Sequence, residues 1–135
     1  DNGGIWQQVG SLPEGSATTS WTLESDPSNP GTVYAGTAGH GVYKSDDFGY
    51  SWTQTTVTQL AAGDAAHIFD LEFNSTGSHL FAGTSRGTWV TTDAGTSWSQ
   101  VDPNEGNLTP TGLAPEIRRL TFGKDVDSDS QPDLY

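Results

Sequence analysis

The stretch that decides the fold runs from Ser45 to Trp52 and reads Ser45-Asp-Asp47-Phe-Gly49-Tyr-Ser-Trp52. It begins with a hydroxyl residue, which is followed by Asp after two positions, Gly after four and Trp after seven. The pattern occurs again later in the chain, and a shorter match without the hydroxyl residue opens it. Its three aspartates follow one another at a spacing of 46 residues. The residues of the three segments are Asp1, Gly3, Trp6, Ser45, Asp47, Gly49, Trp52, Thr91, Asp93, Gly95 and Trp98.

The similarity extends into the sequence between these segments, so the whole period is a repeat. Gly31-Thr-Val-Tyr-Ala-Gly-Thr37 parallels Ser78-His-Leu-Phe-Ala-Gly-Thr84. A period of this length, with short stretches that alternate apolar and polar residues, is typical of the four-stranded blade of a β-propeller. We therefore predict an all-β chain of antiparallel four-stranded blades, in which residues 1–135 form a single, incomplete arc. The approximate repeats are 1–46, 47–92 and 93–135.

Each repeat is expected to supply four strands in the same order. The fourth strand of each blade is expected to begin at the Trp of the motif, so the motif itself forms the turn before it. The chain would end within the second strand of the third repeat. The expected first strands are 21–25, 69–73 and 117–122, the second strands are 33–37 and 80–84, and the third strands are 42–44 and 88–90.

The motif residues have the chemistry that a tight turn needs. An aspartate can accept hydrogen bonds from backbone N–H groups across the turn, and a glycine can adopt a positive φ. The hydroxyl residue can brace the same turn, and the large Trp ring can pack between neighbouring blades. Because equivalent residues of successive blades cannot meet at one point, we expect the aspartates to be structural rather than catalytic.

This pattern resembles the Asp-box, or BNR, repeat of a propeller superfamily that includes glycoside hydrolases, sialidases and receptors. The wording of residues 26–37 and 41–52 is most similar to that of xyloglucanase-like and uncharacterised secreted members. The resemblance implies that the box turns lie away from any substrate site. It does not imply one activity, because the same fold carries hydrolases, receptors and scaffolds.

The catalytic groups of those enzymes have no counterpart in the sequence. A sialidase needs a cluster of three arginines, whereas Arg118 and Arg119 are adjacent and Arg86 lies in another repeat. A xyloglucanase needs two acids that face each other across a cleft, and none of the 17 acidic residues matches its catalytic segments. We expect no catalytic residue in this chain, so that enzyme activity, if the parent protein has it, would arise from glycoside hydrolase residues elsewhere.

The charge of the chain excludes some partners. Five Lys and Arg residues stand against 17 Asp and Glu residues, for a net charge of -12. Such a chain repels the phosphates of nucleic acids and anionic lipid headgroups. There is no cysteine, and no apolar run reaches the length of a membrane span. We expect an extracellular or cell-surface protein with no nucleic-acid partner and no membrane insertion.

An acidic stretch near the end of the chain is a candidate calcium site. Its carboxylates occupy positions 1, 3, 5 and 9 of a possible calcium loop, whereas Ser130 takes the place of the usual glycine. The alternative is a solvated acidic loop that binds no cofactor. The candidate ligands are Asp125, Asp127, Asp129 and Asp133.

Three functions remain open from the sequence. The chain is a secreted or cell-surface module for binding or structure, an arc of a glycoside hydrolase propeller, or a subunit of a repeating extracellular assembly. A glycan is a possible ligand, because Tyr43, Tyr50 and Trp89 can stack on sugar rings if they are exposed, although packing between blades is the alternative. The other expected partners are further blades, supplied by the same polypeptide, by another chain or by copies of this one.

Overall fold

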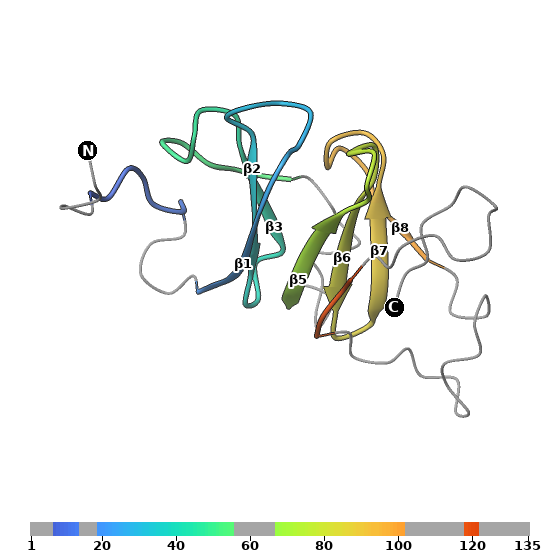
Figure 1. Ribbon diagram of the computed structural model, residues 1–135. Coiled ribbons are helices and arrows are strands. Elements are labelled where there is room, and N and C mark those ends of the chain that lie inside the picture. The colour runs from blue at the N-terminus through green and yellow to red at the C-terminus, as the bar shows by residue number, and fades with distance from the viewer. Residues whose placement is uncertain (1–6, 14–18, 56–66, 102–117, 122–135) are drawn as a thin grey trace.

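The computed structural model describes residues 7–13, 19–55, 67–101 and 118–121. Within these residues the chain forms two antiparallel four-stranded sheets and no helix, as Figure 1 shows. The strand order in each sheet follows the chain order. The predicted fold class is therefore confirmed: the structure is all-β and consistent with an incomplete β-propeller. No helix of the described residues is long and apolar enough to cross a membrane.

The strand bounds agree closely with the expected ones. The first sheet contains β1 (Ser20–Ser25), β2 (Val33–Thr37), β3 (Val42–Ser45) and β4 (Thr53–Gln54). The second sheet contains β5 (Ile68–Phe73), β6 (Leu80–Thr84), β7 (Gly87–Thr91) and β8 (Ser99–Gln100).

Two strand predictions need correction. The fourth strands begin one residue after Trp52 and Trp98. The Trp52 indole N–H donates to the Gly49 carbonyl, so this residue still belongs to the turn. Residues 118–121, from the third expected first strand, have no strand pairing. The segment that was expected to pair with them lies outside the described residues, as do Asp1, Gly3 and Trp6.

The first strands of both sheets carry the same irregularity. The register between β1 and β2 shifts between Ser20 and Thr22, and that between β5 and β6 shifts between Ile68 and Asp70. A β-bulge of this kind leaves one residue unpaired and redirects its side chain. Trp21 and Phe69 therefore occupy equivalent, bulged positions at the beginning of their strands.

The hydrophobic core lies between the two sheets, which stand face to face in Figure 1. Tyr34 is fully buried, and its ring meets that of Phe73 edge to face at a centroid distance of 5.8 Å. Burial of this apolar surface is the main force that holds one blade against the next. The core residues are Tyr34 and Val42 of the first sheet and Ile68, Leu71, Leu80, Ala82 and Trp98 of the second sheet or the turn before β8.

The two ends of the sheets differ in their connections. At one end, called the box end, lie the turns β3–β4 and β7–β8, which contain the Asp-box-like motifs. At the other, called the hairpin end, lie the short connections β2–β3 and β6–β7. Strands β1 and β5 also begin at the hairpin end, because Ser20 pairs with Thr37 and Ile68 with Thr84.

Candidate functional site

The second box turn is closed by hydrogen bonds among its own residues. The Thr91 hydroxyl donates to Asp93 Oδ1 at 2.8 Å and accepts from the Gly95 N–H at 2.9 Å. The Asp93 carboxylate also accepts from the backbone N–H and the hydroxyl of Ser97, at 2.8 and 2.6 Å. Every one of these contacts lies within the turn, so the carboxylate acts as the hub of a local network.

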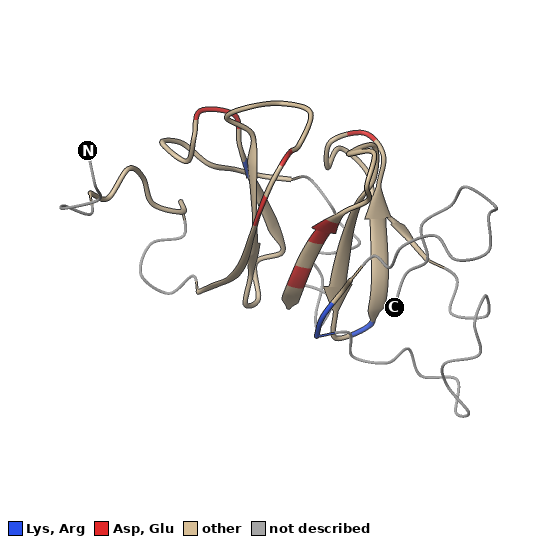
Figure 2. Cartoon of the chain, in the orientation of Figure 1, with Lys and Arg blue, Asp and Glu red and all other residues tan. Residues whose placement is uncertain are grey.

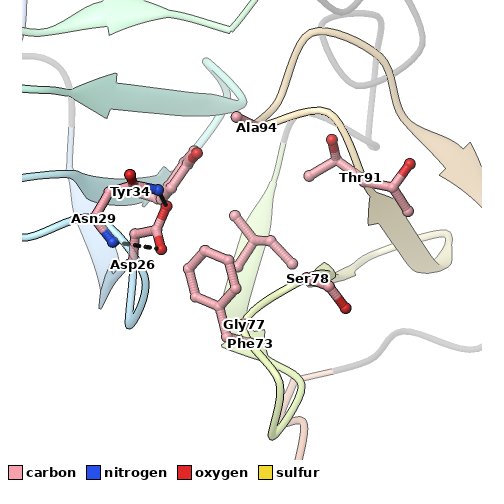
Figure 3. A pocket seen from close by; sticks show the side chains of 10 residues that line it. Asp26, Asn29, Tyr34, Phe73, Gly77, Ser78, Thr91 and Ala94 are labelled. Carbon is pink, nitrogen blue, oxygen red and sulfur yellow. Dashed lines mark hydrogen bonds between the residues drawn. The ribbon is translucent and has the colours of Figure 1, made fainter.

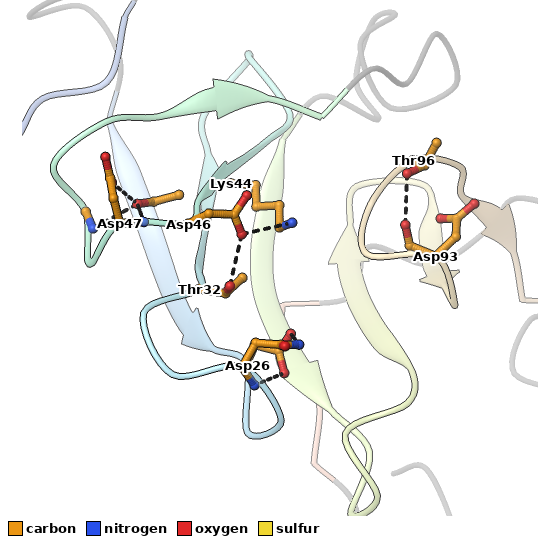
Figure 4. Close-up of polar contacts among 10 residues, drawn as sticks. Asp26, Thr32, Lys44, Asp46, Asp47, Asp93 and Thr96 are labelled. Atoms are coloured by element: carbon orange, nitrogen blue, oxygen red, sulfur yellow. Dashed lines mark hydrogen bonds and ion pairs between the residues drawn. The ribbon is translucent and has the colours of Figure 1, made fainter.

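The first box turn repeats this network. Ser45 Oγ lies 2.8 Å from both Asp47 Oδ1 and the Gly49 nitrogen, and Ser51 donates to the Asp47 carboxylate from its N–H and its hydroxyl. Figure 4 shows Asp47 and Asp93 in their separate turns. Gly49 and Gly95 both have a φ of 88°, a conformation that glycine adopts readily. The structural role of the box residues stays a prediction, which substitutions can test.

We expect Thr91→Val to lower the free energy of unfolding by about 1–3 kcal/mol. The substitution keeps the shape of the side chain but leaves the buried Gly95 N–H without its acceptor, and an unsatisfied buried donor costs about this much. Urea titration followed by circular dichroism measures the change. Thr92→Val, at the exposed neighbouring position, is the matched control, and equal stability of the two variants would contradict the structural role.

The same network controls the ionisation of Asp93. Hydrogen bonds from the Ser97 hydroxyl and N–H, followed by that from Thr91, lower the pKa of the Asp93 carboxyl to about 2. Because the folded-state pKa lies below the unfolded-state value, the stabilisation is present above the ordinary carboxyl pKa and is lost as the pH falls toward 2.

We expect Ser97→Ala to raise the pKa of Asp93 toward its ordinary value, because it removes the largest cause of the shift. NMR titration of the carboxyl carbon measures it. Thr96→Ala is the control, since Thr96 donates to the Asp93 backbone carbonyl and not to the carboxylate (Figure 4). A pKa that both substitutions leave unchanged would contradict this origin of the shift.

The candidate calcium ligands lie outside the described residues, so calcium binding by Asp125, Asp127, Asp129 and Asp133 stays a proposal. Within the described part of the chain, no group of three His, Cys, Asp or Glu side chains is placed to hold a metal ion.

A cavity of about 310 Å³ lies between the sheets at the box end (Figure 3). On one side, Asp26 accepts hydrogen bonds from the Ser28 N–H and from the backbone and side chain of Asn29. Tyr34 lies in the wall of this cavity. Burial, and next the nearby charges of Asp26 and Asp46, raise the pKa of its hydroxyl to about 12. The polar groups of Asp26 and Asn29 form hydrogen bonds within their own loop. We therefore assign the cavity to the junction between blades.

The hairpin end carries a different arrangement, which we call the stacked trio: Trp21, Phe69 and Arg118. The rings of Trp21 and Phe69 are nearly parallel, with centroids 5.0 Å apart and an interplanar angle of 9°. The Arg118 guanidinium carbon lies 4.9 Å from the centroid of Phe69. The three side chains line one cavity of about 200 Å³.

The trio follows from the repeat. Trp21 and Phe69 are the bulged residues of β1 and β5, and Arg118 has the same position in the third repeat, two residues before a leucine. His67, beside Phe69, adds a ring 5.8 Å from that of Trp21. Trp21 nevertheless keeps 46% of its surface exposed. The first strands β1 and β5 and the segment 118–121 thus build one accessible surface of flat groups.

Charge is distributed unevenly between the two ends (Figure 2). The box end carries acidic residues in its loops and turns, whereas arginines lie at the hairpin end, in the β6–β7 connection and in residues 118–121. Lys44, the one lysine of the described part, is paired with Asp46 at 3.0 Å. The acidic residues of the box end are Asp26, Asp46, Asp47 and Asp93.

The aromatic residues that the sequence offered for sugar stacking are placed differently. Tyr43 is buried, and Trp89 packs against the core, so both contribute to packing. Tyr50 is exposed on the first box turn. Trp21 and Phe69 were not expected at a site from the sequence. Alignment of the predicted first strands of the three repeats is the signal that places them together with Arg118.

Comparison with known proteins relates the chain to one group of enzymes. No family model and no curated protein matches it. Among solved structures it is similar to an ancestral GH74 enzyme, with a TM-score of 0.51 and 25% identity over 61% of the chain. It is also similar to a GH74 enzyme of Niastella koreensis, with a TM-score of 0.50 and 25% identity over 60% of the chain. The GH74 xyloglucanase of Xanthomonas campestris has a TM-score of 0.60 and 24% identity over 81% of the chain. At this identity the similarity shows the fold alone.

The structural neighbours are thus β-propeller glycoside hydrolases, and they support a propeller relationship for this chain. The chain spans only 10%, 17% and 13% of the ancestral, Xanthomonas and Niastella enzymes, respectively. A substrate of those whole enzymes can therefore be assigned to this chain only as a proposal.

Proposed function

We propose that the chain is a propeller segment that binds polysaccharide, and that the stacked trio at the hairpin end is its binding surface. The observation that carries this proposal is the half-exposed indole of Trp21, held parallel to Phe69 beside a cavity. Ligand sites typically combine aromatic walls with a few polar groups. The hairpin end has this composition, whereas the box turns use their polar groups internally.

The chemistry of a sugar suits such a surface. One face of a pyranose ring presents C–H groups, which can pack on the face of an aromatic ring, and the hydroxyls at its edge can meet polar side chains. Phe69 and His67 hold the indole of Trp21 from one side, so little side-chain entropy is lost when a ligand binds. A cavity of about 200 Å³ is small for a whole ligand and suits one ring of a longer chain.

The similarity to two GH74 enzymes at 25% identity, which are β-propeller glycoside hydrolases, supports a polysaccharide as the ligand. An extracellular or cell-surface location is part of the proposal, since long polysaccharides are met there. Further blades, from the same polypeptide or another chain, would extend the surface.

The experiment is a binding titration of the chain with xyloglucan oligosaccharides and a panel of other oligosaccharides, by calorimetry. We expect Trp21→Ala to weaken binding of any ligand in the panel by about tenfold or more, which corresponds to about 1.4 kcal/mol. Tyr50→Ala, which removes an exposed aromatic ring from the box end, is the matched control and should bind normally. Absence of binding across the panel, or equal effects of the two variants, would contradict the proposal.

A second candidate, an arc of a glycoside hydrolase, is favoured by the same GH74 similarity. Release of reducing ends from xyloglucan by the parent protein would support it. We expect the isolated chain to release no reducing ends, because none of its acidic residues matches the catalytic segments of a xyloglucanase. Asp70 follows Phe69 in β5, and both of its carboxylate oxygens accept backbone hydrogen bonds. These bonds give the carboxylate a structural role.

A further inference from the structure

We infer that Asp70 is a positioning residue of the stacked trio: its carboxylate holds the segment 118–121 against β5, so that Arg118 completes the wall of the cavity. This inference rests on the proposed function and goes beyond it, because Asp70 is not among the described residues that line the cavity. Three observations carry it: the two hydrogen bonds of the Asp70 carboxylate, the burial of Leu120, and the contact between Arg118 and Phe69.

The Asp70 carboxylate bridges two segments of the chain. Its Oδ1 accepts from the N–H of Leu71, the next residue, at 3.1 Å, and its Oδ2 accepts from the N–H of Leu120 at 2.6 Å. The first bond fixes the direction of the side chain, and the second joins β5 to a segment 50 residues away in the sequence. Hydrogen bonds to an ionised acceptor are roughly twice as strong as those between neutral groups. The carboxylate is therefore well suited to clamp this segment.

Leu120 is the residue through which the segment 118–121 is anchored. Within the described residues this segment has no strand pairing, and it lies at the hairpin end (Figure 1). Leu120 is nevertheless only 4% exposed, whereas the residues on either side of it are exposed. The segment is thus held at Leu120 by burial of the side chain and by the bond from its N–H to Asp70.

The clamp lies directly beside the stacking contact of the trio. Phe69 precedes Asp70 in β5, and the guanidinium carbon of Arg118, two residues before Leu120, lies 4.9 Å from the centroid of the Phe69 ring. Arg118 and Phe69 line the cavity together with Trp21. Loss of the clamp would release the backbone that carries Arg118. A ligand that must first order part of its site binds more weakly.

The repeat shows that the clamp is particular to the second sheet. Thr22 is the residue of β1 that is equivalent to Asp70, since each resumes the strand pairing after the bulge. Its methyl group lies beside Gly36. A carboxylate offers two acceptor oxygens, whereas a threonine hydroxyl has one. A carboxylate at this position can therefore serve its own strand and the next segment at the same time.

The test compares Asp70→Asn with Glu72→Gln by calorimetric titration of the oligosaccharide panel. Both substitutions replace a carboxylate of β5 by an amide, but in the described part of the chain it is Asp70 that binds the segment 118–121. An amide has a single acceptor oxygen, so it cannot serve both N–H groups. For the oligosaccharide that the unmodified chain binds most tightly, we expect Asp70→Asn to weaken binding by about fivefold or more and Glu72→Gln by less than about twofold.

NMR separates positioning from a general loss of structure. A nuclear Overhauser effect between the Arg118 side chain and the Phe69 ring reports the stacking contact, and one between the rings of Trp21 and Phe69 reports the rest of the site. We expect Asp70→Asn to remove the first signal and to keep the second, whereas Glu72→Gln should keep both. Asp70→Ala, which removes both acceptor oxygens, is a second variant with the same expected result.

A double-mutant cycle shows whether Asp70 acts through Arg118. In an Arg118→Met background, Asp70→Asn should change the affinity by less than about twofold. The inference would be overturned by equal affinities of Asp70→Asn and Glu72→Gln, by an Arg118–Phe69 contact that survives in both Asp70 variants, or by an undiminished effect in the Arg118→Met background. Each of these results leaves the proposed sugar binding in place. If the unmodified chain binds no oligosaccharide of the panel, the proposed function fails, and the NMR comparison alone decides whether Asp70 positions Arg118.

Discussion

Leu71→Ala is expected to lower the free energy of unfolding of the chain by about 2–5 kcal/mol, the range for large-to-small substitutions in a well-packed core. Leu71 is 2% exposed and lies among the core residues between the two sheets. Removing its branched end leaves a cavity at the contact between the blades. Because most of the apolar burial in the described residues is at this contact, the effect should be among the largest of any single substitution.

The repeat supplies the control. Leu23 is the equivalent residue of the first sheet, since Leu23 pairs with Ala35 as Leu71 pairs with Ala82. It is 63% exposed, so Leu23→Ala should change the stability by less than about 0.5 kcal/mol. Urea titration of both variants, followed by circular dichroism, measures the difference. Equal losses of stability would contradict the arrangement of the two sheets.

The contrast between these two leucines also bears on partners. The side of the second sheet that carries Leu71 is covered by the first sheet, whereas Leu23 lies exposed on the corresponding side of the first sheet. We propose that another blade covers that side, as the first sheet covers Leu71. In an assembly with this blade, Leu23→Ala should become destabilising.

Trp98→Ala is the second substitution with a large expected effect, a loss of about 3–5 kcal/mol. Trp98 is 3% exposed and belongs to the core cluster between the sheets. Trp52, its counterpart in the first motif, is only half-buried, and its indole N–H donates to the Gly49 carbonyl at 3.0 Å. Trp52→Ala should therefore cost less, about 1–2 kcal/mol.

Circular dichroism is the appropriate signal for this pair, because the substitutions remove the fluorophores themselves. Trp98→Phe, which keeps an apolar ring at the site, should recover much of the lost stability. If Trp52→Ala cost more than Trp98→Ala, the box Trp of the second repeat would not be the residue that packs between blades.

The fold was predictable because the repeat is encoded locally. Ser45, Asp47 and Gly49 form their turn through contacts within seven residues of sequence, so the spacing of the motif is enough to recognise it. Strand bounds followed from alternation of apolar and polar residues. The positive φ values of Phe48 and Ala94 were not anticipated, since neither residue type favours that conformation.

The candidate site was not predictable in the same way. Trp21, Phe69 and Arg118 are far apart in the sequence and differ in chemistry, so they share no motif. Trp21 and Phe69 meet because β-bulges turn equivalent positions of β1 and β5 toward one another, and a bulge leaves little trace in a single sequence. Of the three aromatic residues that the sequence offered for sugar stacking, Tyr43 is buried, Trp89 is half-buried and Tyr50 is exposed.

The most direct test of sugar binding at the stacked trio is an NMR titration of the ¹⁵N-labelled chain with an oligosaccharide, in which the indole N–H signal of each tryptophan is followed. We expect the Trp21 signal to shift in a saturable manner, whereas the signals of the packed Trp89 and Trp98 stay in place. A Trp21 signal that remains unchanged while the chain binds the sugar would contradict the claim that the stacked trio is the binding surface.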